Sequence, residues 1–274
     1  MRNIKAKSFS LRKTVLDMIY SAKSGHIGGD FSVIDILITL YYNQMHISPE
    51  NIHDPERDLF VLSKGHSVEA LYAVLSDLGF LPKEELLKYG QFDTKLIGHP
   101  SNKVNGIEMN SGSLGHGLPV CVGMALGSRI SGRHNRVYTV MGDGELAEGS
   151  VWEGAMAAGN YGLDNLCAVI DRNCLQISGN TESVMCQESI EDRWKSFGWH
   201  VIHSPGHEFD SLNQAFEEAR ATRGMPTVVI AHTVKGYGVS FMENKAAWHH
   251  RIPTAEEYEA ACKELEIKKE ASYE

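Results

Sequence analysis

The stretch VYTVMGDGELAEGSVWEGAMAAGNYG, residues 137–162, contains an apolar run, a glycine-flanked acid and a segment of helical spacing in direct succession. Gly142 and Gly144 let the main chain approach a ligand closely, and the following helix turns its free N–H groups toward the same place. Such a turn normally binds phosphate, but Asp143 places a carboxylate at its centre. At about 4 Å the two anions repel by at least 1 kcal/mol in water. A divalent cation bound to both reverses the sign, so we interpret Asp143 as a metal ligand.

Short β-branched runs alternate with segments of helical spacing along the chain. This alternation predicts an α/β fold with a mainly parallel central sheet and helices on both faces. The chain contains no repeat, low-complexity tract or linker, so residues 1–274 are predicted to form a single domain with terminal helical extensions. Strands are predicted within 58–66, 136–142, 165–171 and 227–232. Helices are predicted at 4–22, 33–45, 67–79, 118–130 and 254–270, with a short one after Pro82.

The charge balance and the apolar segments exclude two classes of partner. A net charge of -9 without any Lys/Arg run disfavours nucleic acids and anionic membranes. The most apolar stretch, residues 31–42, is too short and too interrupted to span a bilayer, and the amino terminus lacks a secretory signal pattern. Five dispersed cysteines favour reduced thiols over disulfides. We therefore expect a cytoplasmic protein.

Polar residues at the ends of two predicted strands leave two interpretations open. The segment GDGELA fits the dinucleotide fingerprint G-x-G-x-x-G/A, with Asp171 at the end of the next strand as the ribose ligand. Asn173 supports the metal interpretation instead, because its amide oxygen and nearby main-chain carbonyls would complete an oxygen shell for Mg²⁺. An isolated asparagine after a strand often only turns the chain, so its pairing with Asp143 carries the argument.

Five segments, taken together and in order, resemble the transketolase family. GDGELAEG with the asparagine of DRNCLQISG is similar to the thiamine-diphosphate motif that begins with GDG and ends in Asn. The segments SGHIGGD, SKGHSVEALYAVL and GHPSNKVNGIEMNSGSLGHGL resemble the three histidine loops of that family. TVKGYGVSFMENKAAWHH resembles its late segment, which carries the last active-site histidine. The resemblance covers nearly the whole chain.

The resemblance implies that the chain binds thiamine diphosphate with Mg²⁺ or Ca²⁺. The metal would be held by Asp143, by the side chain of Asn173 and by the main-chain carbonyl of Leu175. Catalytic contacts to the sugar are implied for His26, His99 and His249, whose imidazoles can move protons near neutral pH. The implied cofactor contacts are His66, Gly112, Leu114, Gly142, Asp143, Gly144, Glu148, Asn173, Leu175, Ile177 and His249.

The resemblance also implies that part of the catalytic machinery lies outside this chain. In transketolases the glutamate that activates the cofactor belongs to a second α/β domain, and no sequence for such a domain remains here. We therefore predict the N-terminal subunit of a split transketolase, inactive alone and assembled as α2β2 with a C-terminal subunit that carries the pyrimidine-binding domain and the activating Glu. Glu148 would lie at that interface, although a first-turn acid also stabilises a helix by itself.

The implied reaction is transfer of a two-carbon ketol unit from a ketose, or ketose phosphate, to an aldose. Alternatives are the α subunit of a 2-oxo-acid dehydrogenase or synthase, a dinucleotide-binding oxidoreductase, and a non-catalytic subunit. The histidine loops favour sugar chemistry, because decarboxylation of a 2-oxo acid does not need so many contacts to hydroxyls. Asp30 predicts an acid near the substrate channel, while the sugars and the roles of His116 and His250 remain open.

Overall fold

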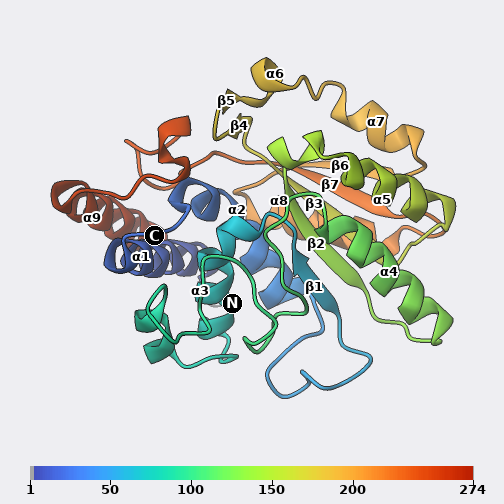
Figure 1. Ribbon diagram of the computed structural model, residues 1–274, viewed down its shortest axis with the longest axis horizontal. Helices are drawn as coiled ribbons and strands as arrows, with labels where there is room; N and C mark the ends of the chain where they lie inside the picture. Colours follow the sequence, from blue (N-terminus) through green and yellow to red (C-terminus); the bar gives the residue numbers. More distant parts are fainter. Residues whose placement is uncertain (1–2, 274) are drawn as a thin grey trace.

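The centre of the fold is a parallel sheet of five strands in the order β1-β2-β3-β7-β6 (Figure 1). The computed structural model describes residues 3–273, so residues 1, 2 and 274 of the predicted domain lie outside the described part. All four strand pairs are parallel, which confirms the predicted α/β class. The strands are β1 (Leu59–Leu62), β2 (Val137–Gly142), β3 (Leu166–Arg172), β6 (His200–Pro205) and β7 (Thr227–His232).

Helices cover both faces of this sheet, as predicted, because successive strand residues point to opposite sides. Val140 and Val169 belong to one apolar core and Met141 and Ile170 to the other. The first core is covered by α1 (Ile4–Ala22), α2 (Ile27–Thr39), α3 (Val68–Asp77) and α8 (Phe209–Ala221). The second is covered by α4 (Gly117–Ile130), α5 (Gly149–Asn160) and α7 (Ile190–Ser196).

The chain begins and ends in neighbouring helices. α9 (Ala255–Ala271) packs beside α1, and the two lie next to each other in Figure 1. Its start is fixed by a capping box, in which Thr254 and Glu257 bond each other's main-chain N–H. The remaining short elements are η1 (Leu40–Gln44), η2 (Gly65–Ser67), η3 (Lys83–Lys88), η4 (Gly144–Ala147), β4 (Leu175–Gln176), β5 (Gly179–Asn180), α6 (Thr181–Val184) and η5 (Ala246–His249).

Three elements differ from the sequence predictions. The helix predicted at 33–45 begins at Ile27, directly after His26, and ends in a π-helical turn. β6 was missed because it is an edge strand whose His203 faces solvent, so its apolar pattern is weak. The antiparallel β4–β5 hairpin was also missed, since each of its strands has only two residues.

Two predictions about the chemistry of the chain can be compared with the structure. Cys121, Cys167, Cys174, Cys186 and Cys262 are all free thiols, as the dispersed spacing predicted. Within residues 3–273, no helix is both long enough and apolar enough to cross a membrane.

Candidate active site

A cavity of about 380 Å³ opens at the carboxyl ends of the central strands. Gly142 and Asp171 are direct neighbours across β2 and β3, so the loops that follow these strands start side by side. The sheet therefore brings distant loops to one edge, where ligands of parallel α/β folds collect. The lining contains every site residue predicted from the sequence, which are His26, His66, His99, Gly112, Leu114, Gly142, Asp143, Gly144, Glu148, Asn173, Leu175, Ile177 and His249. Their individual roles stay predictions.

Histidines from four separate segments form a cluster on one side of this cavity. The His26 ring centroid lies 5.2 Å from that of His66, 6.3 Å from that of His99 and 5.5 Å from that of His249. The exposed His250 also packs on His26, with ring centroids 4.5 Å apart. His26 precedes α2, His66 lies in η2, His249 ends η5, and His99 belongs to a loop, so the cluster exists only in the folded chain.

The close approach of two loops in this cluster depends on a glycine. Gly112 has a φ of +142°, in the region that side chains rarely adopt. A Cβ atom at this position would lie 2.9 Å from Cδ2 of His99. Any larger residue would therefore displace the His99 ring as well as strain the main chain.

The cluster holds its imidazoles in the neutral form near pH 7. Burial lowers the pKa of His26 to about 4, and the adjacent His250 and His99 add to the shift. Burial and the nearby Lys235 lower the pKa of His249 to about 3. The Nδ1 atoms of His26 and His249 are buried and have no hydrogen-bond partner among the described residues. Neutral rings with an unpaired nitrogen can exchange a proton or hydrogen bond with a substrate hydroxyl.

We expect the histidine cluster to make folding stability depend on pH. An unfolded histidine takes up a proton near pH 6.5, whereas folded His26 does so only near pH 4. Stability is therefore lost as the pH falls from 6.5 toward 4. Urea denaturation should show a smaller loss of stability between pH 7 and pH 5 in His26→Gln than in the wild type. The exposed His53→Gln serves as the control, and an unchanged pH dependence in His26→Gln would contradict the assignment.

Asp143 is a buried acid in the same cavity, with only 1% of its surface exposed. Its Oδ1 accepts the Gly144 N–H at 2.8 Å, and its Oδ2 accepts the Cys174 N–H at 2.5 Å. Arg172 lies 3.3 Å from the same Oδ2. Burial and the neighbouring Asp171 nevertheless raise the pKa of Asp143. The positive charge around its ionised form is therefore too small to compensate for burial and for Asp171.

Asn173 and Leu175 lie beside this acid. The Asn173 Oδ1 accepts the Leu175 N–H at 3.1 Å, and its Nδ2 donates to Asp171 at 3.3 Å. These bonds fix the orientation of the amide next to Asp143. The described part of the chain contains no group of three or more His, Cys, Asp or Glu side chains that could hold a metal ion. A metal here would therefore be held by one carboxylate, by amide and main-chain carbonyl oxygens, and by oxygens of a bound small molecule.

Two buried lysines in the cavity lining were missed by the sequence analysis. Lys64 and Lys235 are 1% and 2% exposed, and both line the cavity with the predicted residues. The Lys64 Nζ lies 2.5 Å from Asp171, and burial together with Lys64 lowers the pKa of Lys235 to about 8. Both precede a glycine within the quoted segments SKGH and TVKG, which was the available signal. The two amines supply positive charge where an anionic ligand would bind.

Asp171 does not have the role that the dinucleotide interpretation required. It is fully buried, bonded to Ser32, Lys64 and Thr233, and it does not line the cavity. Burial alone would raise its pKa, but Lys64 holds it below the ordinary value. A residue so enclosed cannot bind a ribose hydroxyl.

Asp30 lies near two lysines of the cavity lining, as predicted, but it does not line the cavity itself. Its side chain is fully buried within α2 and accepts the Ala70 N–H at 3.0 Å, so it does not face a substrate channel. Burial and the adjacent Glu69 raise its pKa well above the ordinary value. Glu145, another buried acid that was missed, lines the cavity and accepts the N–H groups of Gly115 and Gly142 at 2.8 and 3.0 Å. It ties the glycine-flanked loop to the loop before α4.

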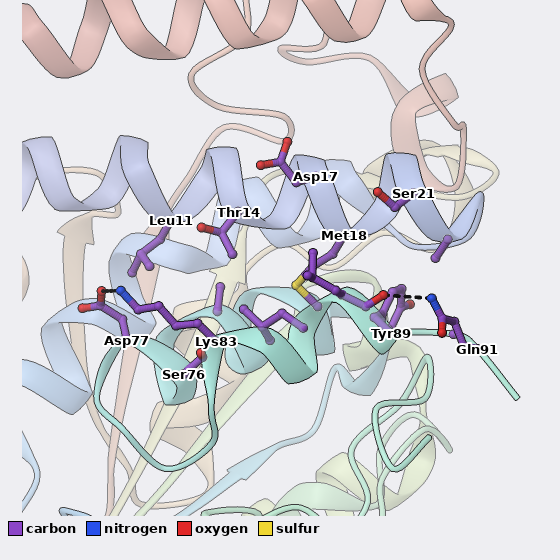
Figure 2. Close-up of a pocket in the computed structure, with 15 residues that line it drawn as sticks. Leu11, Thr14, Asp17, Met18, Ser21, Ser76, Asp77, Lys83, Tyr89 and Gln91 are labelled. Carbon is purple, nitrogen blue, oxygen red and sulfur yellow. Dashed lines mark hydrogen bonds and ion pairs between the residues drawn. The ribbon is translucent and has the colours of Figure 1, made fainter. Parts of the chain in front are cut away.

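A second cavity, of about 360 Å³, lies between α1, α3 and the segment after α3 (Figure 2). It is lined by apolar residues such as Leu11, Met18 and Leu86, with the Lys83–Asp77 ion pair, 4.0 Å long, at one side. Among the described residues that line it, none was predicted as part of the site. The chemical groups gathered in the first cavity therefore make it the candidate active site.

Comparison with known proteins identifies the family of the chain. The family model described as "Transketolase, thiamine diphosphate binding domain" matches residues 5–274. The chain belongs to the transketolase family. This transketolase-family chain is 47% identical over 265 residues to one of the subunits of apulose-4-phosphate transketolase from Phocaeicola vulgatus, covering 97% of this chain and 94% of the relative. It is 43% identical to the 6-deoxy-6-sulfo-D-fructose transketolase subunit of Clostridium sp., covering 93% and 94% of the two chains.

The same family is found among solved structures. A transketolase variant from Pichia stipitis superimposes with a TM-score of 0.89 at 27% identity, over 98% of this chain and 45% of that chain. The chain thus spans less than half of the solved transketolase and nearly all of the two subunit relatives. It is a transketolase subunit with the thiamine-diphosphate-binding domain, and family membership replaces the 2-oxo-acid and dinucleotide alternatives.

Proposed function

We propose that this subunit binds the diphosphate of the cofactor through Mg²⁺ or Ca²⁺, and that it works with a separate C-terminal subunit in a two-plus-two assembly. The single observation that carries the proposal is the cavity in which Asp143, Asn173 and the buried Lys64 and Lys235 lie together. The carboxylate of Asp143 by itself repels a diphosphate and binds it through a cation, while the two amines attract it. In the same cavity, the histidine cluster supplies neutral imidazoles for a sugar.

The residues present fit a hard cation bound together with a diphosphate. Asp143, the Asn173 amide and the Leu175 carbonyl offer only oxygen ligands, which suits Mg²⁺ or Ca²⁺. The raised pKa of Asp143 indicates an acid that gains from nearby positive charge. These three ligands leave positions open in a six-oxygen shell, and phosphate oxygens would fill them. Cation and cofactor are therefore expected to bind cooperatively.

When bound, thiamine diphosphate supplies a nucleophilic carbon that accepts the two-carbon unit. The residues of this chain then have separate tasks. His26, His99 and His249 orient the hydroxyl groups of the ketose and move protons between them, since their rings are neutral. Lys64 and Lys235 hold the diphosphate end, and Gly144 lets the main chain approach it.

We infer that α4 and α5 form the surface that meets the partner subunit. The two helices pack side by side, with α5 beginning at the loop of the candidate active site (Figure 1). Apolar residues are exposed on these helices and directly after α5: Ile130 is 78% exposed, Met156 56% and Tyr161 51%. The exposed Glu148 is the N-cap residue of α5, and its side chain does not bond the free main-chain N–H groups of the first turn. The apulose-4-phosphate transketolase relatives are named as single subunits of their enzymes, which supports a partner here.

Replacing Met156 by aspartate is expected to weaken assembly with the partner by at least about tenfold, because a charge would be buried in an apolar interface. Ile267→Asp on α9 is the matched control, since Ile267 is 55% exposed on a distant helix. Sedimentation of each variant with the partner measures the effect, and activity at limiting partner should fall in parallel. Equal assembly by both variants would show that α5 is not the interface.

The substrate is proposed to be a ketose with an anionic terminus. Two relatives, 47% and 43% identical to this chain, are named for apulose 4-phosphate and for 6-deoxy-6-sulfo-D-fructose, one a phosphorylated and the other a sulfonated sugar. The test is an assay of the reconstituted pair with apulose 4-phosphate, 6-deoxy-6-sulfofructose, fructose 6-phosphate and pyruvate. Turnover of one or more ketoses, with none of pyruvate, is the expected result. Turnover of pyruvate alone would overturn the proposed sugar chemistry.

A further inference from the structure

A third cavity, of about 610 Å³, lies at the edge of the sheet opposite the candidate active site. The residues that immediately precede β1, β2 and β3 all line it, and they are Asp58, Arg136 and Asn165. Because the strands are parallel, this cavity is at their amino ends, and the whole length of the sheet separates it from the histidine cluster. None of the site residues predicted from the sequence lines it.

Five arginines from two segments of the chain, 129–136 and 220–223, line this cavity. None of them is within 4 Å of a carboxylate in the described chain, whereas Arg12 and Arg172, elsewhere in the fold, each form an ion pair. In a protein of net charge -9, such a concentration of unneutralised guanidinium groups is unexpected unless a ligand supplies the negative charge. The five are Arg129, Arg133, Arg136, Arg220 and Arg223.

Main-chain carbonyls position several of these arginines without neutralising them. Arg129 donates to the Tyr161 carbonyl at 2.8 Å, Arg136 donates to the Ala219 carbonyl at 3.1 Å, and Arg220 donates to the Gln44 carbonyl. A guanidinium has five N–H donors, so each of these three side chains is fixed in place while most of its donors remain available. This is the arrangement of a preformed anion site.

The acids around the cavity are occupied by main-chain N–H groups. Asp58 accepts the N–H of Arg136 at 2.7 Å, Glu56 accepts that of His134 at 3.0 Å, and Asp164 accepts that of Gly224 at 3.0 Å. These carboxylates hold loops together and are outnumbered by the arginines. The lining therefore keeps an excess of positive charge.

Buried polar atoms without partners provide an independent indication of a ligand. Asn135 is 4% exposed and lines the cavity, yet its Oδ1 has no hydrogen-bond partner among the described residues. The Oδ1 of Asn165 and the Nε of Arg136, from two other lining residues, are also buried without a hydrogen-bond partner among the described residues. Native proteins rarely leave buried polar atoms unpaired. The two amide oxygens require hydrogen-bond donors, which fully ionised phosphate groups lack but sugar hydroxyls or base amino groups provide.

We propose that this arginine cavity, defined by its five arginines together with Asn135 and Asn165, binds a small metabolite that carries at least two phosphate groups and several hydroxyl or amino groups. A nucleotide or a sugar bisphosphate has this chemistry. One or two arginine guanidinium groups bind a single phosphate group, so five arginines match a ligand with more than one phosphate group. The concave shape and the overall negative charge of the protein favour a small ligand over a polynucleotide.

Calorimetric titration of the chain with ADP and with fructose 1,6-bisphosphate, in EDTA, tests the proposal. EDTA removes the metal on which diphosphate binding at the candidate active site is expected to depend. At least one of the two ligands should bind, and its dissociation constant should rise tenfold or more in the double variant Arg133→Gln/Arg223→Gln. Both side chains are exposed, so the variant should fold, as its thermal midpoint will show. Adenosine, which lacks phosphate, should not bind.

Two control variants decide where any bound ligand lies. Arg193→Gln/Arg251→Gln removes the same charge elsewhere and should leave the affinity unchanged, while Lys235→Met alters only the candidate active site. Loss of affinity in Lys235→Met with no change in Arg133→Gln/Arg223→Gln would overturn the proposal. Failure of both phosphorylated ligands to bind the wild type, or adenosine binding as tightly as ADP, would overturn it as well.

Discussion

Asp143→Ala is expected to abolish Mg²⁺-dependent binding of thiamine diphosphate and to lower the activity of the reconstituted enzyme by at least about 100-fold. Loss of a residue that supports a metal site commonly costs 10- to 100-fold, and Asp143 would be a ligand of the metal itself. Without its carboxylate, the Asn173 amide and the Leu175 carbonyl are the protein ligands that remain, and both are neutral. Calorimetry with the cofactor and an assay of sugar turnover measure the two effects.

The same substitution should not lower stability, which separates a functional loss from misfolding. Burial and Asp171 raise the pKa of Asp143, so its ionised form opposes folding at neutral pH. The thermal midpoint of Asp143→Ala should equal or exceed that of the wild type, although Arg172 loses one of its partners. Asp210→Ala, at an exposed acid on α8, is the control and should leave activity intact. Full cofactor binding by Asp143→Ala would contradict the assignment.

Lys64→Met is expected to reduce the free energy of unfolding by about 3–5 kcal/mol, because it leaves Asp171 as an unpaired buried charge. Lys64 and Asp171 have side chains that are 2% and 0% exposed, and their charged atoms lie 2.5 Å apart. Ser32 and Thr233 also donate to Asp171, but neutral hydroxyls do not replace a cation. Urea denaturation at pH 7 measures the loss.

A second variant and a change of pH test the cause of this loss. Lys64→Met/Asp171→Asn removes both charges and should recover at least half of the lost stability. In the wild type the pKa of Asp171 is lowered, so this acid stabilises the fold above its unfolded pKa, and that contribution is lost as the pH falls. In Lys64→Met burial raises that pKa instead, so the loss of stability relative to the wild type should be smaller at pH 5 than at pH 7. An equal loss at both pH values would contradict the electrostatic cause.

The sequence predicted the architecture well where the physical pattern was strong. Buried runs such as 165–171 alternate with helical spacing, and this alternation is enough to predict a parallel sheet with helices on both faces. The pattern failed at β6, because polar His200 and His203 interrupt an edge strand. It failed at the β4–β5 hairpin, because two-residue strands carry no periodicity. Local patterns therefore predict only elements that bury a regular apolar face.

The candidate site was predicted through its motifs, and the buried charges were not. Lys64 and Lys235 escaped notice because lysines are rarely buried, and Asp171, the partner of Lys64, was considered only as the ribose ligand of the dinucleotide alternative. Asp30 was predicted near the substrate channel, but the helix that begins at Ile27 directs its side chain into the core and not into the cavity. Whether a polar residue such as Asp30 faces the cavity or the core depends on where the helix begins. A short glycine-rich segment does not reveal that position.

The most direct test of the central claim is calorimetric titration of thiamine diphosphate into this chain mixed with its partner subunit, with Mg²⁺ and with EDTA. The account predicts tight binding of the cofactor only when both the partner and Mg²⁺ are present, and weak binding or none by the chain alone. Binding of equal strength in EDTA would contradict the role of Asp143 and Asn173 as metal ligands. Absence of Mg²⁺-dependent binding by the mixed subunits would contradict the proposed function as a whole.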